Sequence, residues 1–246
     1  MDEAVILQNT VAELVTANHI LFDRGIVDGF GHVSVRHPLR ADHFLLSRNR
    51  APALVTAEDI LTFDLDGNIA DRKNEPSYLE RFIHGEIYRA RPDVLAVVHS
   101  HAVSILPFTV VTSAPLCPVC HMSGFIKRGT PVFEIRCHAG EGSDLLIRTP
   151  ELGRHLASTL GNHVLVLMRG HGMTIVGATL RQAVFRSVYA EVNARIQTTA
   201  GTMGDVTFLT AEEADAADAT GTTGINRAWE FWALSAEQTA TRLRGA

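Results

Sequence analysis

The chain has 246 residues, of which 46% are hydrophobic and 20% are charged, the balance of a globular protein that buries a full core. A net charge of −5 with scattered basic residues argues against nucleic-acid binding, and no run of about 18 apolar residues is present to span a membrane. The acidic N-terminus does not resemble a signal peptide, and three cysteines are an odd number for a disulfide framework. We therefore expect a cytoplasmic protein with one domain over residues 1–246 and reduced thiols.

In chain order, the first half begins with a predicted helix and continues mainly with short strands. The opening segment repeats its apolar residues at three- and four-residue spacing, which is typical of an amphipathic helix. Glycine-containing turns separate the next segments, which alternate or carry β-branched residues. The predicted elements are a helix over residues 3–24, strands over 32–36 and 43–47, a strand with its turn over 60–69, a helix over 78–90 and a strand over 95–101.

The second half alternates predicted strands and helices. The elements are a strand over residues 132–135, a helix over 150–159, strands over 163–168 and 173–176 with a turn between them, and helices over 180–199 and 226–243. The stretch 210–223 is rich in alanine, aspartate and threonine, and we predict a mobile surface segment there. Strands and helices mixed around one core indicate a layered α/β domain.

Three histidines form the main candidate for a metal site. His99 and His101 lie two residues apart at the end of a predicted strand, which places both on one face. His171 follows another buried strand and lies between Gly170 and Gly172, which permit a sharp turn. Three protein ligands are common in catalytic sites that leave a position for substrate. The alternatives are one core and one solvent-facing histidine for the pair, and an exposed turn for His171.

Glu80 is predicted near the start of the 78–90 helix, with His84 one turn further on the same face. A carboxylate near a metal ion can transfer protons. A lone helical glutamate is more often a solvated surface charge. The residues alone leave both interpretations open.

Residues 117–121, CPVCH, match the attachment pattern of c-type haem. That chemistry normally requires export. A structural zinc site would need a second pair of ligands, which Cys137 and His138 could supply. We favour buried thiols in a loop over both alternatives.

Several longer motifs resemble the class II aldolase/adducin family over about residues 8–232. The matching segments are GFGHVSVR, EPSYLERFIHGEIYRARPDVLAVVHSHAV, the RGHG turn and the terminal RAWEFW. Glu80 precedes His99 by nineteen residues, which is the family's spacing. The resemblance implies Glu80 as the catalytic acid/base and His99, His101 and His171 as the metal ligands.

The resemblance also implies a fold, a cofactor and an assembly. The expected fold is an α/β, three-layer αβα sandwich around a mostly antiparallel central sheet. The expected cofactor is one divalent metal ion, zinc or manganese before cobalt or iron, with no organic cofactor. The expected assembly is a homotetramer with active sites at subunit interfaces, and we expect no nucleic-acid or membrane partner.

Departures from the family pattern indicate the substrate. Sugar-phosphate aldolases of the family carry a glycine-containing phosphate-binding stretch and a serine pair before the catalytic glutamate, whereas this chain has SRNR at residues 47–50 and SYL at 77–79. Arginine pairs bidentately with carboxylates, so this arginine pair suggests a carboxylate-bearing substrate. Two plain surface arginines in a loop are an equally open alternative. The candidate substrate-binding residues are Ser47, Arg48, Arg50 and His121.

The segments SRNRAPALVTAEDIL and ERFIHGEIYRARPDV are most similar to a decarboxylase branch of the family, which acts on hydroxylated pyridine and benzene dicarboxylates. We therefore expect a lyase that removes one carboxylate from a small aromatic substrate of this kind in a metal-dependent reaction. One alternative is an aldolase that cleaves a non-phosphorylated carboxylated substrate. A less favoured alternative is a non-catalytic interaction module, which would have lost the metal ligands that this chain retains.

Overall fold

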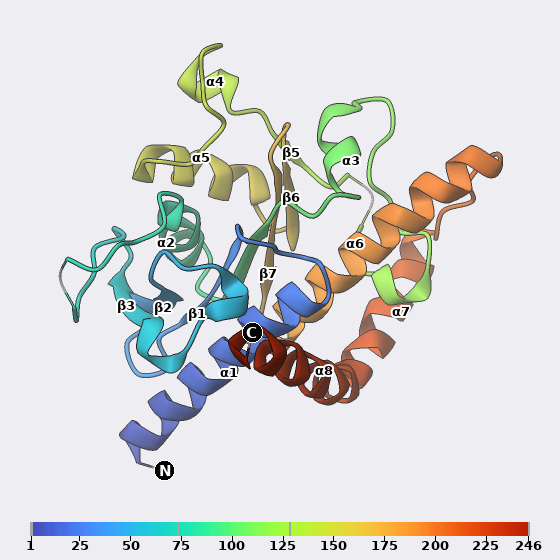
Figure 1. Ribbon diagram of the computed structural model, residues 1–246. Coiled ribbons are helices and arrows are strands. Elements are labelled where there is room, and N and C mark those ends of the chain that lie inside the picture. The colour runs from blue at the N-terminus through green and yellow to red at the C-terminus, as the bar shows by residue number, and fades with distance from the viewer. Residues whose placement is uncertain (1, 73, 128, 246) are drawn as a thin grey trace.

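The computed structural model describes residues 2–72, 74–127 and 129–245, and a seven-stranded sheet runs through its centre (Figure 1). The strands lie in the order β3-β2-β1-β4-β7-β6-β5, and all neighbours are antiparallel except β5 and β6. The strands are β1 (His32–Arg36), β2 (His43–Ser47), β3 (Ile60–Asp64), β4 (Ala96–Ser100), β5 (Val132–Phe133), β6 (Leu165–Met168) and β7 (Gly172–Gly177).

Helices cover both faces of this sheet. The helices are α1 (Glu3–Asp23), α2 (Arg81–Ala90), α3 (Leu106–Val110), α4 (Arg136–Ala139), α5 (Pro150–Leu160), α6 (Leu180–Met203), α7 (Ala211–Gly221) and α8 (Ile225–Gly245). Short 3₁₀ helices are η1 (Pro52–Leu54), η2 (Ala57–Asp59), η3 (His121–Ser123) and η4 (Thr222–Gly224). Within the described residues, none of these helices combines the length and the apolar composition that a bilayer crossing requires.

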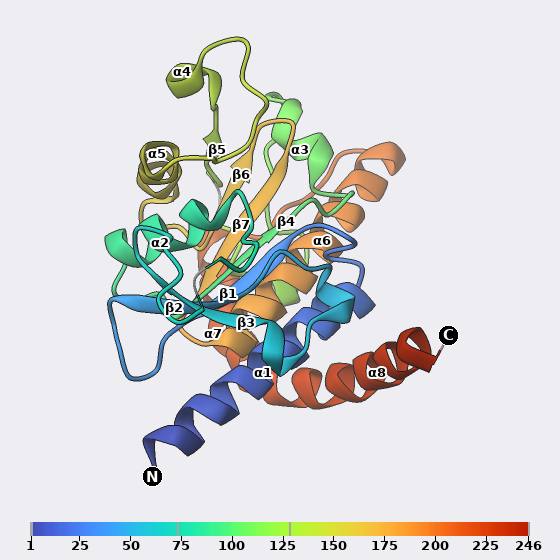
Figure 2. The same cartoon turned by 60° about the vertical axis from the view of Figure 1, so that its left-hand side comes forward.

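Two hydrophobic clusters occupy the two faces of the sheet. One cluster joins the sheet to α1, α6 and α8, and the other joins it to α2 and α5, as Figures 1 and 2 show from two sides. Alternation along β4 produces this division, because Ala96 and Val98 pack in the first cluster and Val97 packs in the second. The predicted three-layer sandwich around a mostly antiparallel sheet is confirmed.

Helix α8 packs against both α1 and α6. Its Trp232 ring lies 6.4 Å from the Phe185 ring and 6.1 Å from the Tyr189 ring of α6, measured between centroids. The hydroxyl of Thr239 donates to Asp23 at the end of α1, 2.7 Å away. Figure 2 shows α1 and α8 crossing at the edge of the fold. This part of the chain therefore closes the first cluster.

The prediction of a mobile segment over residues 210–223 is wrong, because α7 occupies most of it. The Thr210 side chain accepts from the backbone N–H of Glu213, whose carboxylate accepts from the backbone N–H of Thr210. This capping box provides partners for two N–H groups at the start of the helix. Ala214 is buried where α7 meets Gly124, next to η3. The T-x-x-E spacing of Thr210 and Glu213 is a sequence signal for a helix start, and the prediction from composition did not take it into account.

Gly85 provides a test of how closely α2 approaches the rest of the chain. Glycine to alanine inside a helix normally stabilises by about 0.5–1 kcal/mol. A Cβ at Gly85 would lie only 2.4 Å from the carbonyl oxygen of Leu65, whereas Gly201 in α6 has nothing within 4 Å. We expect Gly85→Ala to lower the free energy of unfolding by about 1–3 kcal/mol, and Gly201→Ala to leave it unchanged or raise it.

Urea denaturation of both variants beside the parent chain measures the difference. Equal or greater stability of Gly85→Ala would contradict the close approach of α2 to Leu65.

Candidate metal centre

Four side chains direct their ligand atoms to one point. The Nε2 atom of His101 lies 3.0 Å from Nε2 of His99 and 3.0 Å from Nε2 of His171. The Oε2 atom of Glu80 lies 3.5 Å from Nε2 of His99 and 3.4 Å from Nε2 of His171. All four ligand atoms lie within 4.8 Å of one another, and no other such group was found in the described part of the chain. The structure thus brings together all four residues that the sequence proposed for the centre.

The central strands deliver these side chains. His99 belongs to β4 and His101 follows its end, while His171 lies in the turn between β6 and β7. A Cβ at Gly172 would lie 2.1 Å from the carbonyl oxygen of Ser100, so only glycine allows β7 to run this close to the end of β4. The close approach places the turn beside the histidines of β4.

The donor atoms fit a divalent cation. The Nδ1 atom of His99 lies 3.1 Å from the carbonyl oxygen of Met173, and Nδ1 of His171 lies 2.9 Å from that of Leu145. A carbonyl oxygen only accepts, so both Nδ1 atoms donate, and both Nε2 atoms present lone pairs to the same point. Ligands about 2.1 Å from a tetrahedral metal ion lie about 3.4 Å apart, close to the separations found here.

Burial and neighbouring charge prepare the group for metal binding. Burial, together with the nearby His99 and His171, lowers the pKa of His101 to about 4, so the ring is neutral near pH 7. Burial raises the pKa of Glu80, but the nearby His99 and His171 outweigh burial and hold that pKa well below its usual range. A neutral imidazole and an ionised carboxylate are the forms that coordinate metal ions.

Residues 145–147 hold both Glu80 and His171 through backbone hydrogen bonds. The backbone N–H of Ile147 donates to Oε1 of Glu80 over 2.9 Å, and the carbonyl of Leu145 accepts from His171. Leu145 has a φ of 69°, a left-handed conformation that is unusual for a bulky residue and costs about 1–3 kcal/mol. The sequence contained no signal for this brace, because leucine does not favour such a conformation.

The helix predicted over residues 78–90 begins later than expected. α2 begins at Arg81, so Glu80 is its N-cap residue and lies just outside the helix. Its carboxylate reaches the histidines of the centre. His84, one turn along α2, contacts His32 instead, with 2.6 Å between Nε2 of His84 and Nδ1 of His32.

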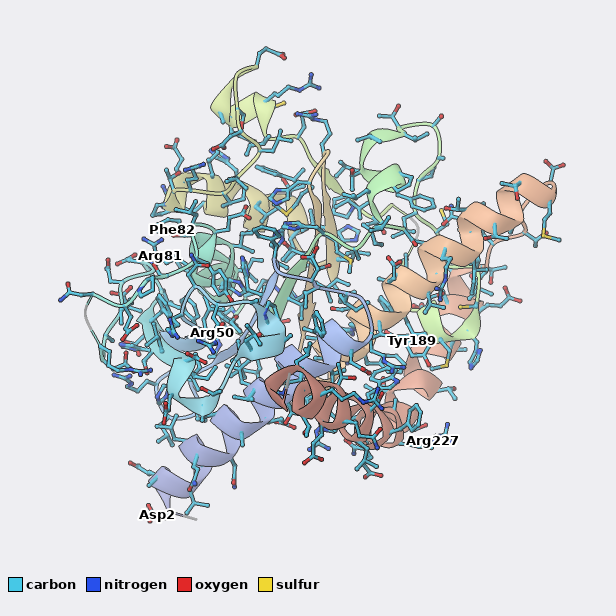
Figure 3. All side chains as sticks on the ribbon, in the orientation of Figure 1. Asp2, Arg50, Arg81, Phe82, Tyr189 and Arg227 are labelled. Atoms are coloured by element: carbon cyan, nitrogen blue, oxygen red, sulfur yellow. The ribbon has the colours of Figure 1, made fainter. Side chains whose placement is uncertain are left out.

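The arginine pair lies on the side of the molecule formed by β1, β2, β3 and α2, where Figure 3 labels Arg50. Asp59 pairs with both arginines, at 2.6 Å from Nε of Arg48 and 3.3 Å from Nε of Arg50. Nε of Arg50 donates its hydrogen bond to the carbonyl of Leu54 over 2.7 Å. Among the described residues, no hydrogen bond of an Nη atom of either arginine is found. The terminal donors of two half-buried guanidinium groups are therefore available to a ligand.

Tyr78 links this stretch to the metal centre, a role that sequence analysis missed. Its hydroxyl lies 3.0 Å from Oγ of Ser47 and donates to the carbonyl of Arg50. Its ring lies 4.7 Å from the ring of His32, which lies 5.0 Å from the ring of His99. Ser47 is thus connected to the centre through the rings of Tyr78 and His32.

His121 is exposed in η3 beside α7, and no contact with the centre is found for it among the described residues. The cysteines of the CPVCH motif are also separate from the metal-ligating group. The loop that carries them is bound to α6, where the side chain of Asn193 contacts the backbone of Cys117 and Val119. The role of His121 in substrate binding stays a prediction.

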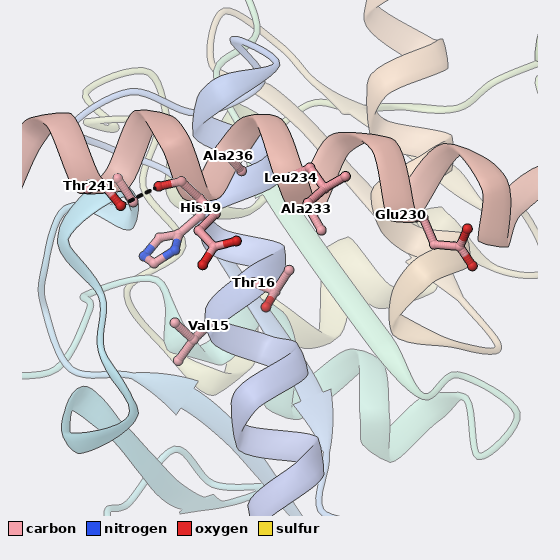
Figure 4. A pocket seen from close by; sticks show the side chains of 10 residues that line it. Val15, Thr16, His19, Glu230, Ala233, Leu234, Ala236 and Thr241 are labelled. Atoms are coloured by element: carbon pink, nitrogen blue, oxygen red, sulfur yellow. Dashed lines mark hydrogen bonds between the residues drawn. The ribbon is translucent and has the colours of Figure 1, made fainter.

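A groove of about 720 Å³ lies between α1 and α8, on the opposite face of the sheet from α2 (Figure 4). His19 and Glu230 lie towards its two ends, and Nε2 of His19 lies 2.9 Å from the carbonyl oxygen of Val55. The groove holds no group of three or more metal-ligating side chains in the part of the chain that the structure describes.

We expect the chain to bind one divalent ion, and His171→Ala to lose it, because the substitution removes one of three converging nitrogen atoms. The metal content per chain after dialysis, measured by elemental analysis, checks this. His121→Ala is the matched control, since its exposed ring lies outside the centre, and it should retain the ion. Full retention of metal by His171→Ala would contradict the assignment.

Comparison with known proteins agrees with this geometry. The family described as Class II Aldolase and Adducin N-terminal domain matches residues 12–198. The decarboxylase tropJ of Talaromyces stipitatus is 36% identical, with 92% of this chain and 94% of that protein covered. The 3,4-dihydroxyphthalate decarboxylase of Arthrobacter keyseri is 29% identical, with coverages of 78% and 81%.

Solved structures show the same fold. The L-fuculose 1-phosphate aldolase of Glaciozyma antarctica is similar with a TM-score of 0.75 and 22% identity, with 99% of this chain and 93% of that chain covered. An aldolase II superfamily protein of Pseudomonas syringae has a TM-score of 0.76, 22% identity and coverages of 95% and 94%. The decarboxylase relatives assign the chain to the lyases, and specifically to the carboxy-lyases. This chain belongs to the class II aldolase/adducin family.

Proposed function

We propose that this carboxy-lyase is metal-dependent and removes one carboxylate from a hydroxylated aromatic dicarboxylate. The observation that carries the proposal is the convergence of three histidines and Glu80 on one point. The arginine pair, which contacts Asp59 and has no hydrogen bond at its terminal donors among the described residues, is a candidate site for a substrate carboxylate. The relative from Arthrobacter keyseri supports the proposal, because its name describes a benzene ring with two hydroxyls and two carboxylates.

His99, His101 and His171 would hold the ion, with zinc or manganese proposed before cobalt or iron. When bound, the ion supplies positive charge that stabilises a substrate oxyanion and the electron pair left by the broken carbon–carbon bond. The chain needs no organic cofactor for this reaction. Nδ1 of His99 and Nδ1 of His171 stay bound to backbone carbonyls and keep both rings in one orientation.

Glu80 is the proposed proton carrier. In the reaction the bond between the ring carbon and the carboxylate breaks, carbon dioxide leaves, and one proton adds to the same ring carbon. Oε1 of Glu80 is bound to the backbone N–H of Ile147, which leaves Oε2 to carry that proton on the side of the histidines. Because the Glu80 carboxylate is ionised in the resting centre, Oε2 takes this proton from water in each turnover and passes it on.

Arg48 and Arg50 are the proposed sites for the carboxylate that stays on the ring. Asp59 pairs with both guanidinium groups, and the carbonyl of Leu54 accepts from Nε of Arg50, so their Nη donors are oriented before the substrate arrives. Ser47 is oriented by Tyr78 and would contribute a hydroxyl. We also propose the homotetramer with active sites at subunit interfaces, and His121 as a further substrate contact. Sedimentation of the purified chain tests the assembly.

The function is tested by incubating the metal-loaded chain with hydroxylated phthalates and pyridine dicarboxylates. Release of carbon dioxide and the ultraviolet spectrum of the ring are followed, with His99→Ala as the inactive control. We expect metal-dependent release that the control lacks. Release of an aldehyde from a non-phosphorylated carboxylated substrate, without carbon dioxide, would overturn the proposal in favour of an aldolase.

Glu80→Gln should lower kcat by at least about 100-fold, because the amide cannot carry the proton. Three histidines remain, so the metal content should stay at the parent level. Steady-state kinetics and elemental analysis on the same sample separate the two effects. An active Glu80→Gln chain would remove this residue from the mechanism.

Arg48→Ala and Arg50→Ala should each raise KM about tenfold, because each removes a charged donor to the retained carboxylate. Asp59→Asn should raise KM in the same direction, since it weakens the bonds that orient both arginines. Arg89→Ala is the matched control, because Arg89 is an exposed arginine of α2 that pairs with Asp66. An unchanged KM in all three variants would place carboxylate binding elsewhere.

A further inference from the structure

A chain of buried hydrogen bonds continues inward from the metal centre. The hydroxyl of Tyr88 lies 2.8 Å from Oγ of Ser34, which lies 2.6 Å from Nδ1 of His84. Nε2 of His84 lies 2.6 Å from Nδ1 of His32. None of these four side chains is more than 4% exposed, so their polar atoms depend on protein groups, and not on bulk water, for hydrogen bonds.

The outer end of this chain lies beside a metal ligand. His32 in β1 pairs directly with His99 in β4, and side chains at paired positions share one face of a sheet. The ring of Tyr78 packs on His32, 4.7 Å away. Nδ1 of His32 is bound to His84, which leaves Nε2 as its second polar atom. Among the described residues no hydrogen-bond partner is found for Nε2, and the protein does not fully enclose this atom.

Only one direction of donation along these four side chains gives every N–H and O–H proton an acceptor. Burial raises the pKa of Tyr88, so its hydroxyl stays protonated, and Ser34 is the acceptor found for it among the described residues. If Tyr88 donates to Ser34, then Ser34 donates to His84, and His84 donates through Nε2 to Nδ1 of His32.

The opposite direction leaves a proton without an acceptor. If Nδ1 of His32 donated to His84, then His84 would donate to Ser34, and Ser34 would donate to Tyr88. The hydroxyl proton of Tyr88 would then have no acceptor among the described residues, and a buried donor without an acceptor destabilises the fold. Burial also lowers the pKa of His84 to about 3, so this ring is neutral and carries only one proton.

We propose that Tyr88, Ser34 and His84 are positioning residues that hold His32 in the tautomer with a bare Nδ1 and a protonated Nε2, directed at the metal-binding pocket. There, the Nε2–H group binds an oxygen of the substrate. The tautomer follows from the hydrogen-bond chain alone, and the substrate contact rests on the proposed function. His32 thus adds a neutral donor to a pocket whose other histidines present lone pairs.

Nitrogen NMR of the zinc-loaded chain with ¹⁵N-labelled histidine tests the tautomer. The His32 signals are assigned by their loss in His32→Gln. We expect a pyridine-like Nδ1 and a pyrrole-like Nε2. A proton on Nδ1 of His32 would overturn the inference, whatever activity the chain has.

Tyr88→Phe tests whether the series of hydrogen bonds from Tyr88 to His32 sets this tautomer, because it removes the hydroxyl and keeps the ring. We expect the His32 signals to shift towards a mixture of tautomers and kcat/KM to fall about tenfold at unchanged metal content. Tyr189→Phe is the matched control in α6 (labelled in Figure 3), and it should change neither.

The outcomes separate this inference from the proposed function. If the His32 signals are unchanged in Tyr88→Phe, even with a lower melting temperature, Tyr88 has only a structural role and does not set the His32 tautomer. If no aromatic carboxylate is decarboxylated, the proposed function and the substrate contact fail, while the predicted signals of His32 would still establish the tautomer.

Discussion

The register of β4 between β1 and β7 is the constraint on which the rest of the site depends. It places His99 opposite His32 on one side and Thr174 on the other. A slip of one residue would turn every side chain of β4 to the opposite face and exchange the two hydrophobic clusters. The burial of Val97 among the residues of α2 and α5 therefore fixes the direction of His99 as well.

The histidines around this strand differ in character although they are the same residue type. His99 and His171 give their Nδ1 protons to backbone carbonyls and keep bare Nε2 atoms for a cation. In the proposed arrangement, His32 accepts a hydrogen bond at a bare Nδ1 and keeps a donor at Nε2. Partners outside the pocket thus decide what each ring offers inside it, which is the general role of groups that surround metal ligands.

Sequence reasoning succeeded where a local pattern carries the structure. The two-residue spacing of His99 and His101, the glycines around His171 and the alternation of the strands all predicted positions that the fold reproduces. It failed where a residue acts through distant contacts. The attachment of Asp59 to two arginines and the left-handed Leu145 depend on tertiary packing, which no pattern in one sequence encodes. The missed α7 is different, because its capping signal was present.

The left-handed turn at Leu145 has a consequence for how this site can change. Residues 145–147 hold both Glu80 and His171 through hydrogen bonds, so a shift of this stretch would displace both side chains. The arginine pair is anchored separately, by Asp59. If the arginine pair binds substrate as proposed, substitutions near η2 would change which molecule is accepted and leave the positions of Glu80 and His171 intact. The residues proposed for bond cleavage and those proposed for substrate selection could then vary independently within one fold.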